Sequence, residues 1–499
     1  MPKRTAAFDL TLPLRDSETA AYLWLYGALR SEILEGRLAP GARLPASRDL
    51  ARQYQLSRGT IVNAFERLKS EGYLEGSIGS GTYVSKVLPD ELLHVERGAR
   101  RTGDSQQPLH PKPRRRMSSY AGRAGLFPAL EPRPARAFRS NVPAVDLFPA
   151  GLWAQLAARR WRQASTNLLL GCDPLGYRPL QEAVADYLNT SRGVRCSAER
   201  IAIVSGVQEA LDLVARLFLN PGDRVCLENP GYIGAAMVFE SVGAKISSMG
   251  LDDEGMELRA PGLRGARLVY VTPGHQFPLG ISMSLPRRLQ LLDWARKSGA
   301  LIFEDDYDSE YRYSGRPVPA LQGLDRHGSV LFAGSFSKVL FPSLRLGYLV
   351  IPPDLVDRFA AAKSIASRHA QLLDQAVLCD FITAGHFGRH LRRMRSVYAE
   401  RLSVLLQGAR ERLAGLLDIS GVEAGLQTVG WLRNRITGES AARAAAARNV
   451  EVIPLSRYHR GRASREGLQL GFAAVDRREI ERGVRELAAA LETALRVPH

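Results

Sequence analysis

The sequence has few cysteines and lacks the patterns that define several common protein classes. Its four cysteines, Cys172, Cys196, Cys226 and Cys379, are scattered and form no CxxC pair, which argues against a disulfide framework or a zinc site. The first residues, MPKRTAAFDLTLPLRD, lack the apolar core of a secretory signal. No run of eighteen apolar residues indicates a membrane span. We therefore expect a cytoplasmic protein with no bound metal and no membrane partner.

Acidic residues are outnumbered by basic ones. Lysine and arginine together number 68 against 51 aspartates and glutamates, a formal net charge of +17 at pH 7. Such an excess favours contact with polyanions such as nucleic acid, although it does not determine the fold. The hydrophobic fraction of 45% is that of an ordinary globular protein, and 499 residues are enough for two or three domains.

The chain divides into three zones of different composition. Residues 15–86 and 141–499 carry regular apolar patterns, whereas residues 87–140 are rich in Arg, Pro, Gly and Ser without sustained apolar periodicity. Such a composition is typical of a flexible basic linker. We therefore expect an N-terminal domain at 15–86, a linker at 87–140 and a large C-terminal domain at 141–499.

The first zone has the pattern of a winged helix-turn-helix. One apolar face recurs through residues 22–33, and Ser47 precedes a second short helical stretch. Ser57 is a natural N-cap for a third helix, which Gly72 ends. The stretch YLEGSIGSGTYVS then predicts a small hairpin. In such a module the third helix presents polar side chains to base edges in the DNA major groove.

The stretch GARLPASRDLARQYQLSRGTIVNAFERLKSEGYLEGSIGSGTYV resembles the DNA-binding module of the GntR family of bacterial regulators along its whole length. The resemblance implies a double-stranded DNA operator as the partner of this domain. An arginine at the start of the third helix can bind guanine through two hydrogen bonds. The DNA-contacting positions expected from the match and from the polar helix face are Arg43, Arg48, Ser57, Arg58, Thr60, Asn63 and Gly81.

From residue 201 onward, short apolar runs alternate with helical stretches. IAIVSG, DRVCLENPGY, ARLVYVTPGHQFP, ALIFEDDYDSE, SVLFAGSFSK and LRLGYLV each contain an apolar run of strand length, and VQEALDLVARLF and PRRLQLLDWARKSG read as helices. This alternation predicts an α/β fold with a mostly parallel sheet covered by helices. In such sheets ligands bind at the carboxyl ends of the strands, where this sequence has its polar motifs.

Lys338, in the motif GSFSK, is the residue expected to carry the chemistry. A lysine at a strand end can form a Schiff base with an aldehyde when desolvation and neighbouring cations lower its pKa. Ser335, Ser337 and Arg345 offer the hydroxyl groups and the guanidinium that suit a phosphate. The stretch SGVQ, from Ser205, begins a helix whose free N–H groups attract an anion.

Acidic and aromatic residues at neighbouring strand ends suit an aromatic cofactor. Strand alternation puts Asp305 and Asp306 on opposite faces. Only one of them can therefore hold a protonated ring nitrogen, as a pyridoxal phosphate ring requires. Tyr307 can reach the phenolic oxygen of such a ring, and Tyr232 in the motif ENPGY can stack on its face.

The region from about 141 to 495 resembles a fold-type I aminotransferase of class I, through the ordered motifs SGVQEALDL, ENPGY, TPGHQFPLG, EDDYDSEYRY and GSFSKVLFPSLRLGYLV. With the N-terminal module, the chain is similar to the MocR subgroup of GntR regulators over nearly its whole length. The resemblance implies pyridoxal 5'-phosphate bound through Lys338, Asp305 as partner of the pyridine nitrogen, and a head-to-tail homodimer. The cofactor-binding positions expected are Gly206, Val207, Gln208, Tyr232, His275 or Gln276, Asp305, Tyr307, Ser335, Ser337, Lys338 and Arg345.

One position departs from the subgroup's pattern, and one role is not assigned. Gln427, in GLQTVGWL, stands where the resemblance would place histidine. The sequence does not fix which arginine would bind the carboxylate of an effector. The candidates are Arg433, Arg435, Arg457, Arg462 and Arg465.

Three functions are open at this level. The first, favoured by the winged helix and the basic linker, is a transcription regulator that senses a small amine, an amino acid or pyridoxal phosphate itself. The second is an active aminotransferase that also binds DNA. The third is a pyridoxal phosphate enzyme whose N-terminal module binds proteins. The effector, the operator sequence and the direction of regulation are not specified by the sequence.

Overall fold

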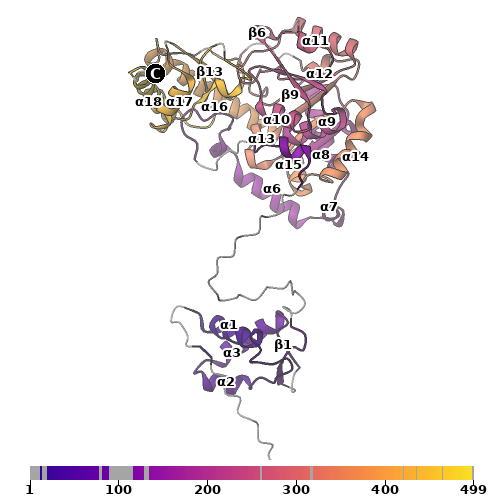
Figure 1. Ribbon diagram of the computed structural model, residues 1–499, viewed down its shortest axis with the longest axis vertical. Helices are drawn as coiled ribbons and strands as arrows, with labels where there is room; N and C mark the ends of the chain where they lie inside the picture. The colour runs from indigo at the N-terminus through magenta and orange to yellow at the C-terminus, as the bar shows by residue number, and fades with distance from the viewer. Residues whose placement is uncertain are drawn as a thin grey trace, which may run out of the picture. The chain divides into compact units, whose positions relative to one another are not determined.

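The computed structural model describes residues 12–13, 19–77, 81–88, 116–127, 134–258, 261–314, 319–419, 421–433, 435–463 and 465–496. The chain separates into two compact units, residues 1–114 and 115–499, and some of their helices and strands are labelled in Figure 1. Half of the linker expected at 87–140, residues 89–115, lies outside the described residues. Within the described ranges, no helix is long and apolar enough to cross a membrane, and no group of three His, Cys, Asp or Glu side chains is placed to hold a metal ion.

Three helices and a hairpin form the first unit. They are α1 (Ala21–Leu34), α2 (Ser47–Gln53), α3 (Arg58–Ser70) and the antiparallel strands β1 (Leu74–Ser77) and β2 (Gly81–Val84). The apolar face predicted through residues 22–33 supplies Leu25, Leu29 and Ile33 to the core, each at most 1% exposed. Burying a side chain of this size stabilises a fold by about 1.5–3 kcal/mol. The order of elements is that of the predicted winged helix-turn-helix.

The second unit begins earlier than the sequence indicates. The composition predicts a linker up to residue 140, whereas the chain belongs to the second unit from residue 115 onward. Ala137 and Phe138 are fully buried in the largest core cluster of this unit, and Phe138 forms an isolated bridge with Gly471. Surrounding arginines and prolines hide these two apolar side chains in the sequence. The described residues from 116 onward therefore group with the second unit, and the domain bounds expected from the sequence stay a prediction.

A short helix upstream of residue 128 lies along a helix of the second unit. α5 (Ser119–Arg123) packs against α10 (Ile233–Ser241). The Nε of Arg123 donates to the carbonyl oxygen of the last α10 residue over 3.1 Å, and a cation is favoured at that end of a helix. Further along, the ring of Phe127 meets the ring of Tyr232, with centroids 6.4 Å apart. Residues 116–127 are therefore anchored at both ends of α10.

A seven-stranded sheet with the strand order β3-β11-β10-β9-β8-β4-β5 forms the centre of the second unit. Its strands are β3 (Ile201–Val204), β4 (Arg224–Glu228), β5 (Lys245–Met249), β8 (Ala266–Val271), β9 (Leu301–Asp306), β10 (Val330–Ser335) and β11 (Gly347–Val350). In this sheet β11 pairs antiparallel with both neighbours, and the other pairs are parallel. The predicted mostly parallel α/β fold is confirmed. All six predicted strands are present, and β5 was missed because its sequence, KISSM, is half polar.

Helices cover both faces of this sheet. Ile201 and Ile203 of β3 belong to one core cluster, whereas Ala202 and Val204 belong to another. Because alternate residues of a strand point to opposite faces, the two clusters lie on opposite sides. The first cluster includes residues of α8 (Arg178–Ser191) and α15 (Leu372–Thr383), and the second includes residues of α9 (Val207–Phe218), α10 and α14 (Val356–Ala366). Further α-helices are α6 (Ala150–Arg162), α7 (Thr166–Leu170), α11 (Leu285–Ser298), α12 (Leu321–Leu324) and α13 (Phe336–Val339), and β6 (Leu251–Asp252) pairs with β7 (Gly255–Met256).

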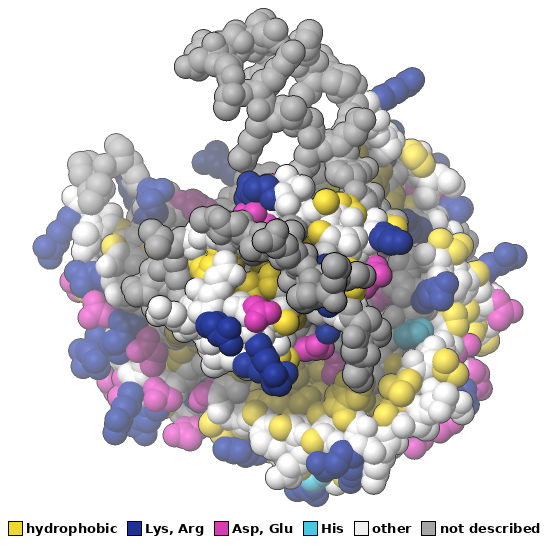
Figure 2. All heavy atoms as spheres, turned by 90° about the horizontal axis from the view of Figure 1, so that it is seen from below, with side chains coloured by type: hydrophobic (Ala, Val, Ile, Leu, Met, Phe, Trp, Pro, Cys, Tyr) yellow, Lys and Arg dark blue, Asp and Glu magenta, His cyan; other side chains and the backbone are white. Residues whose placement is uncertain are grey.

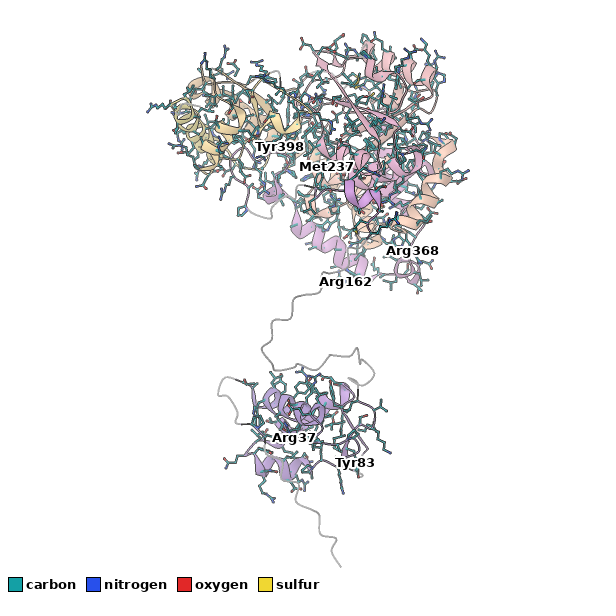
Figure 3. All side chains as sticks on the ribbon, in the orientation of Figure 1. Arg37, Tyr83, Arg162, Met237, Arg368 and Tyr398 are labelled. Atoms are coloured by element: carbon teal, nitrogen blue, oxygen red, sulfur yellow. The ribbon has the colours of Figure 1, made fainter. Side chains whose placement is uncertain are left out.

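A smaller sheet with three helices forms a lobe at one side of the second unit, seen around β13 in Figure 1. Its strand order is β12-β13-β15-β14. The elements are β12 (Leu417–Ile419), β13 (Gln427–Leu432), β14 (Ile453–Pro454), β15 (Gly467–Gly471), α16 (His386–Arg412), α17 (Gly438–Ala446) and α18 (Arg477–Arg496). The main-chain N–H of Ala144 donates to the hydroxyl of Tyr398 on α16, labelled in Figure 3, over 2.9 Å. The start of the C-terminal domain is thus tied to this lobe.

Candidate cofactor site and nucleic-acid interface

The predicted polar motifs meet at one edge of the large sheet. Ser335, the last residue of β10, is opposite Gly347 of β11, which is opposite Val204 at the end of β3. On the other side of β10, Asp306 of β9 is opposite Gly334. SGVQ, EDDY and GSFSK therefore lie side by side, at the carboxyl ends of their strands, where α/β sheets bind ligands.

Lys338 lies in α13, directly after β10, and is partly buried. Its Nζ donates to the main-chain carbonyl oxygen of Asn141 over 2.9 Å. Desolvation lowers the pKa of Lys338 to about 8, although Asp308 and Asp305 act in the opposite direction and Arg345 lowers it further. A lysine with such a pKa presents an unprotonated, nucleophilic amine in about a tenth of molecules at pH 7, far more than an ordinary lysine does.

Asp305 and Asp306 have different partners, as expected for neighbours on a strand. Asp305 is 5% exposed and accepts a hydrogen bond from the hydroxyl of Tyr270 over 2.7 Å. Desolvation raises the pKa of Asp305 to about 7. Asp306 forms a buried ion pair with Arg192, with 2.5 Å between Oδ2 and Nη2. Asp306 thus has a structural partner, and Asp305 is the one of the two whose charge acts on Lys338.

Hydrogen-bond donors converge where β3 ends and α9 begins. Gly206, with a φ of +127°, is the N-cap of α9, and no side chain caps the first N–H groups of this helix. The guanidinium of Arg345 lies against it, because a Cβ on Gly206 would be 3.5 Å from both Nη atoms. Ser335 Oγ accepts from the N–H of Ser337, whose own buried Oγ has no hydrogen-bond partner among the described residues. This donor set suits a phosphate.

Aromatic side chains lie beside these groups. The hydroxyl of Tyr232 accepts from Gln208 Nε2 over 2.8 Å, and its ring is stacked with that of Tyr270 at a centroid distance of 6.4 Å. The hydroxyl of Tyr307 lies 3.0 Å from His275 Nδ1. Tyr232 thus contacts Gln208, and Tyr307 contacts His275. All four are among the positions predicted to bind the cofactor.

Gln276 and His275 differ in their surroundings. The Nε2 of Gln276 donates to the carbonyl oxygen of Pro230 over 2.9 Å and to Glu228 Oε2 over 3.3 Å. These bonds use the amide to hold neighbouring loops together. Of the two residues predicted near the phenolic oxygen, His275 is the one beside Tyr307, and its Nε2 is buried without a partner in the described structure.

The arrangement fits pyridoxal phosphate, the group that the sequence resemblance implies. The partnerless Ser337 hydroxyl and the uncapped start of α9 suit its phosphate. The buried Asp305 suits its ring nitrogen, and the amine of Lys338 suits its aldehyde carbon. The roles of the individual residues stay predictions.

Three residues around this site were not identified from the sequence. Tyr270 lies inside the apolar run of β8, where nothing distinguishes it from a core residue. Asn141 lies at the expected end of the linker, 197 residues from Lys338. Arg192 follows α8 in a polar stretch. Only the fold brings these residues to the site, and no local signal in the sequence marks them.

The predicted DNA contacts lie on exposed parts of α2, α3 and the wing. Arg48, Arg58 and Asn63 are exposed, and Arg58 is the first residue of α3. Arg43 lies against the wing, because a Cβ on Gly81, which has a φ of +99°, would be 3.0 Å from Arg43 Nε. Glycine at this position therefore allows both the left-handed backbone and the close approach of the arginine.

The hydroxyls of Ser57 and Thr60 interact with each other at the N-terminus of α3, which Ser57 caps. Ser57 Oγ accepts from the N–H of Thr60 over 3.1 Å and lies 2.8 Å from Thr60 Oγ1. An N-cap of this kind contributes about 0.5–2 kcal/mol to stability. DNA contact by these two residues stays a prediction. Val62, which is 39% exposed on α3, was not predicted, and an apolar side chain there can contact the methyl group of thymine.

Charge is spread over the visible surface. Figure 2 shows Lys and Arg side chains scattered among acidic ones and not gathered into one continuous patch. The net charge of +17 therefore does not by itself locate a nucleic-acid interface. That interface is indicated instead by the winged helix-turn-helix geometry of the first unit.

A winged helix-turn-helix in the same chain as an aminotransferase-type sheet, with a lysine after β10, defines a class of DNA-binding regulators. The family described as "Aminotransferase class I and II" matches residues 138–487, and "Bacterial regulatory proteins, gntR family" matches residues 21–84. The chain belongs to the MocR-type transcription regulators of the GntR family, with a C-terminal domain of the class I and II aminotransferase family.

Individual relatives agree with this assignment. The chain is 39% identical over 477 residues to the probable rhizopine catabolism regulatory protein MocR of Rhizobium meliloti, a match that covers 95% of this chain and 94% of the relative. It is 31% identical over 472 residues to the HTH-type transcriptional regulator TauR of Rhodobacter capsulatus, with coverages of 92% and 94%. A similar solved structure is LysN, the alpha-aminoadipate aminotransferase of Thermus thermophilus, complexed with N-(5'-phosphopyridoxyl)-L-leucine. Its TM-score is 0.69 at 30% identity, over 76% of this chain and 98% of that one.

Proposed function

We propose that this protein holds pyridoxal phosphate at Lys338 and changes its binding to DNA when a small amine, an amino acid or the cofactor itself occupies the C-terminal domain. The observation that carries the proposal is the presence, in one chain, of an exposed recognition helix and a lysine with a pKa lowered to about 8 beside a buried carboxylate. Membership of the MocR-type regulators supports it.

Different residues of the site would bind different parts of the cofactor. Pyridoxal phosphate supplies an electrophilic carbon that captures primary amines. Lys338 would provide the amine that attaches it, and Asp305, oriented by the hydroxyl of Tyr270, would keep a proton on the ring nitrogen. Tyr307, with His275 at its hydroxyl, would donate to the phenolic oxygen. These contacts would fix the ring in one orientation.

The phosphate would be held apart from the reacting carbon. The first N–H groups of α9, the hydroxyls of Ser335 and Ser337 and the guanidinium of Arg345 would bind its oxygens. Tyr232, whose hydroxyl is fixed by Gln208, would cover a face of the ring. An effector amine would then meet a cofactor that is already positioned.

We further propose that the protein acts as a head-to-tail homodimer in the cytoplasm. Trp161, Leu169 and Leu170, from α6 and α7, are 61%, 65% and 80% exposed, and exposed apolar side chains of this size suit an interface. A dimer carries two DNA-binding units, so its operator would contain two half-sites. Analytical ultracentrifugation of the full chain measures the oligomeric state directly.

A second candidate is an aminotransferase that also binds DNA. The observation in its favour is the pKa of Lys338, since an enzyme of this class needs a lysine that can also accept and release a proton. Incubation of the purified protein with a panel of amino donors and keto-acid acceptors separates the candidates. Sustained product formation would identify an enzyme, whereas binding without turnover agrees with a regulator.

The proposal is tested by locating the cofactor and by measuring DNA binding with and without it. The purified full chain should be yellow, and borohydride reduction followed by peptide mapping should place the pyridoxyl label on Lys338. Lys338→Ala should lose covalent attachment, and its binding to the DNA upstream of its own gene should no longer respond to amines. A label on another lysine, or no specific DNA binding by the wild type, would refute the proposal.

A further inference from the structure

Two buried glutamines of the small sheet share one face. Gln427 is the first residue of β13 and Gln469 lies in β15, and they are 2% and 0% exposed. In the antiparallel pairing of these strands, Gln427 is opposite Gly471 and Val429 is opposite Gln469. The two glutamines are therefore diagonal neighbours, and long side chains at diagonal positions come within reach of each other.

Each of the two glutamines accepts a hydrogen bond at its amide oxygen, whereas its amide nitrogen donates to no described residue. The main-chain N–H of Asn141 donates to Gln427 Oε1 over 3.0 Å, and the hydroxyl of Tyr458 donates to Gln469 Oε1 over 2.7 Å. Both Nε2 atoms are buried and have no hydrogen-bond partner in the part of the chain that the structure describes. Native proteins seldom leave buried donors unpaired. Two such donors side by side therefore indicate a ligand that supplies acceptors.

Asn141 connects both glutamines to the lysine of the cofactor site. Its N–H donates to Gln427, and its carbonyl oxygen accepts from Lys338 Nζ. Its side chain acts to lower the pKa of Tyr458, whose hydroxyl donates to Gln469. Asn141 has a φ of +65°, a left-handed conformation that asparagine adopts more readily than most residues. The partnerless donors thus belong to the immediate surroundings of the Lys338 amine.

The donors of this cluster are neutral. The arginines considered from the sequence as carboxylate ligands are all exposed: Arg433, Arg435, Arg457, Arg462 and Arg465. Arg433, for example, pairs with Asp418. The groups that act on Lys338 include two carboxylates, Asp305 and Asp308. Arg345 also acts on Lys338 but is assigned to the phosphate in the proposed function. An effector carboxylate would then meet the charges of Asp305 and Asp308 near Lys338 and only uncharged donors from the glutamines, which disfavours its ionised form.

We propose that the amide nitrogens of Gln427 and Gln469 form an effector subsite for a primary amine that carries neutral hydroxyl or ether oxygens and no carboxylate. The inference deepens the proposed function and rests on it, since the amine of the effector has to reach the cofactor at Lys338. The glutamines donate to the oxygens of the effector, and the anchored amide oxygens keep the donors aimed at one place. Hydroxylated amines are selected because an amine without oxygens leaves both donors unpaired.

Three amines of similar length test the chemistry on the wild-type full chain loaded with pyridoxal phosphate. They are 1-amino-1-deoxyglucitol, hexylamine and L-norleucine, and binding is followed by the absorption band of the cofactor. The hydroxylated amine should bind about tenfold or more tighter than each of the others. Tightest binding of norleucine would overturn the proposal. So would equal affinities, which are expected if ordered water satisfies the two amides.

Variants assign the selectivity to the glutamines. Gln427→Met and Gln469→Met keep side-chain length and remove the donors, so each should lower the preference for the hydroxylated amine over hexylamine by about tenfold. Gln375→Met is the matched control, because Gln375 is equally buried but its Nε2 already donates to Ala370. It should change the melting temperature and leave the preference unaltered. An unchanged preference in folded Gln427→Met and Gln469→Met would refute the subsite.

The failure of this inference is distinguishable from failure of the proposed function. If borohydride places no label on Lys338, the proposed function fails, and the subsite fails with it. If the label is on Lys338 and the cofactor band responds to norleucine before the hydroxylated amine, only the subsite fails. The wild-type titrations decide this even if a methionine variant does not fold.

Discussion

The protonation of Lys338 should set the pH at which the cofactor attaches. Desolvation lowers the pKa of this lysine to about 8, and only the neutral amine attacks an aldehyde. The rate at which pyridoxal phosphate becomes covalently attached to the cofactor-free protein should rise with pH and level off above about 8. Borohydride trapping at intervals from about pH 6 to about pH 10 measures it. A rise that continues toward the ordinary lysine pKa near 10.4 would contradict this.

Replacing Asp305 by alanine should lower cofactor affinity, whereas replacing Asp306 by alanine should lower the free energy of unfolding. Asp305→Ala removes the proposed partner of the ring nitrogen, so cofactor affinity should fall by roughly tenfold to a hundredfold, the loss of one charged hydrogen bond. Asp306→Ala leaves the buried Arg192 unpaired and should lower the free energy of unfolding by about 3–5 kcal/mol.

Cofactor titration and denaturant unfolding of both variants separate these effects. The folded fraction of Asp306→Ala should keep the cofactor affinity of the wild type. Equal losses of cofactor affinity in the two variants would show that the assignment of the faces of β9 is wrong.

The sequence was informative for residues that follow an apolar strand. Lys338 and Asp305 stand out because charged residues end apolar runs, and the fold gathers strand ends at one edge. Asn141 and Gln469 do not stand out. The contacts of Asn141 with Lys338 and Gln427 span 197 and 286 residues of sequence, and such distances carry no local pattern.

At the scale of elements, α3 and α2 should make two kinds of DNA contact. Arg58 opens α3, where side chains reach base edges, so Arg58→Ala should cost about 1–3 kcal/mol on the specific operator and relax specificity at one base position. Arg48, on α2, is expected at the phosphate backbone. Arg48→Ala should weaken all sequences about equally and reduce the salt dependence by roughly one phosphate contact.

Binding titrations of the wild type and both variants, on specific and scrambled DNA at several salt concentrations, measure these effects. Both arginines are exposed, so neither substitution should alter the stability of the first unit. Wild-type affinity of Arg58→Ala for both DNAs would show that α3 does not read the operator.

Elements with regular patterns were predicted, and those with mixed patterns were not. α9 was expected from the stretch VQEALDLVARLF and spans the same residues, 207–218. β14, with only two residues, has no periodicity to detect. Phe138 was assigned to the linker because arginine and proline surround it, although its burial depends on a bridge to Gly471 far along the chain. Long-range pairing overrides local composition in such cases.

At the scale of the whole molecule, limited trypsin digestion should separate the two units. The sequence predicts cleavage between Arg97 and Arg139, and most of that stretch lies outside the described residues. Because Arg123 donates to the end of α10, we expect the first cuts upstream of residue 116. The product should be a yellow C-terminal fragment that keeps pyridoxal phosphate and no longer binds DNA specifically.

Mass spectrometry of the early fragments identifies the cut sites. Arg123→Ala is a second variant to digest, because losing its bond to α10 should loosen residues 116–127 and speed chymotrypsin cleavage at Phe127, which is 46% exposed in the wild type. First cuts inside the folded units, with residues 97–115 intact, would contradict a cleavable linker.

The anchoring of residues 116–127 along α10 limits the length of the tether that joins the two units, and this length can be expressed in base pairs of DNA. Between residues 88 and 116 the chain has about 28 residues, and a polypeptide covers at most about 3.3–3.6 Å per residue, so this tether reaches no further than roughly 95 Å. A tether that ran free to residue 140 would reach nearly twice as far. Since duplex DNA rises about 3.4 Å per base pair, an anchored tether spans at most roughly 28 base pairs. In the proposed dimer each DNA-binding unit has its own tether, so two anchored tethers together reach at most roughly 56 base pairs beyond the spacing of their two anchor points. A wider separation of the half-sites would require α5 to leave α10.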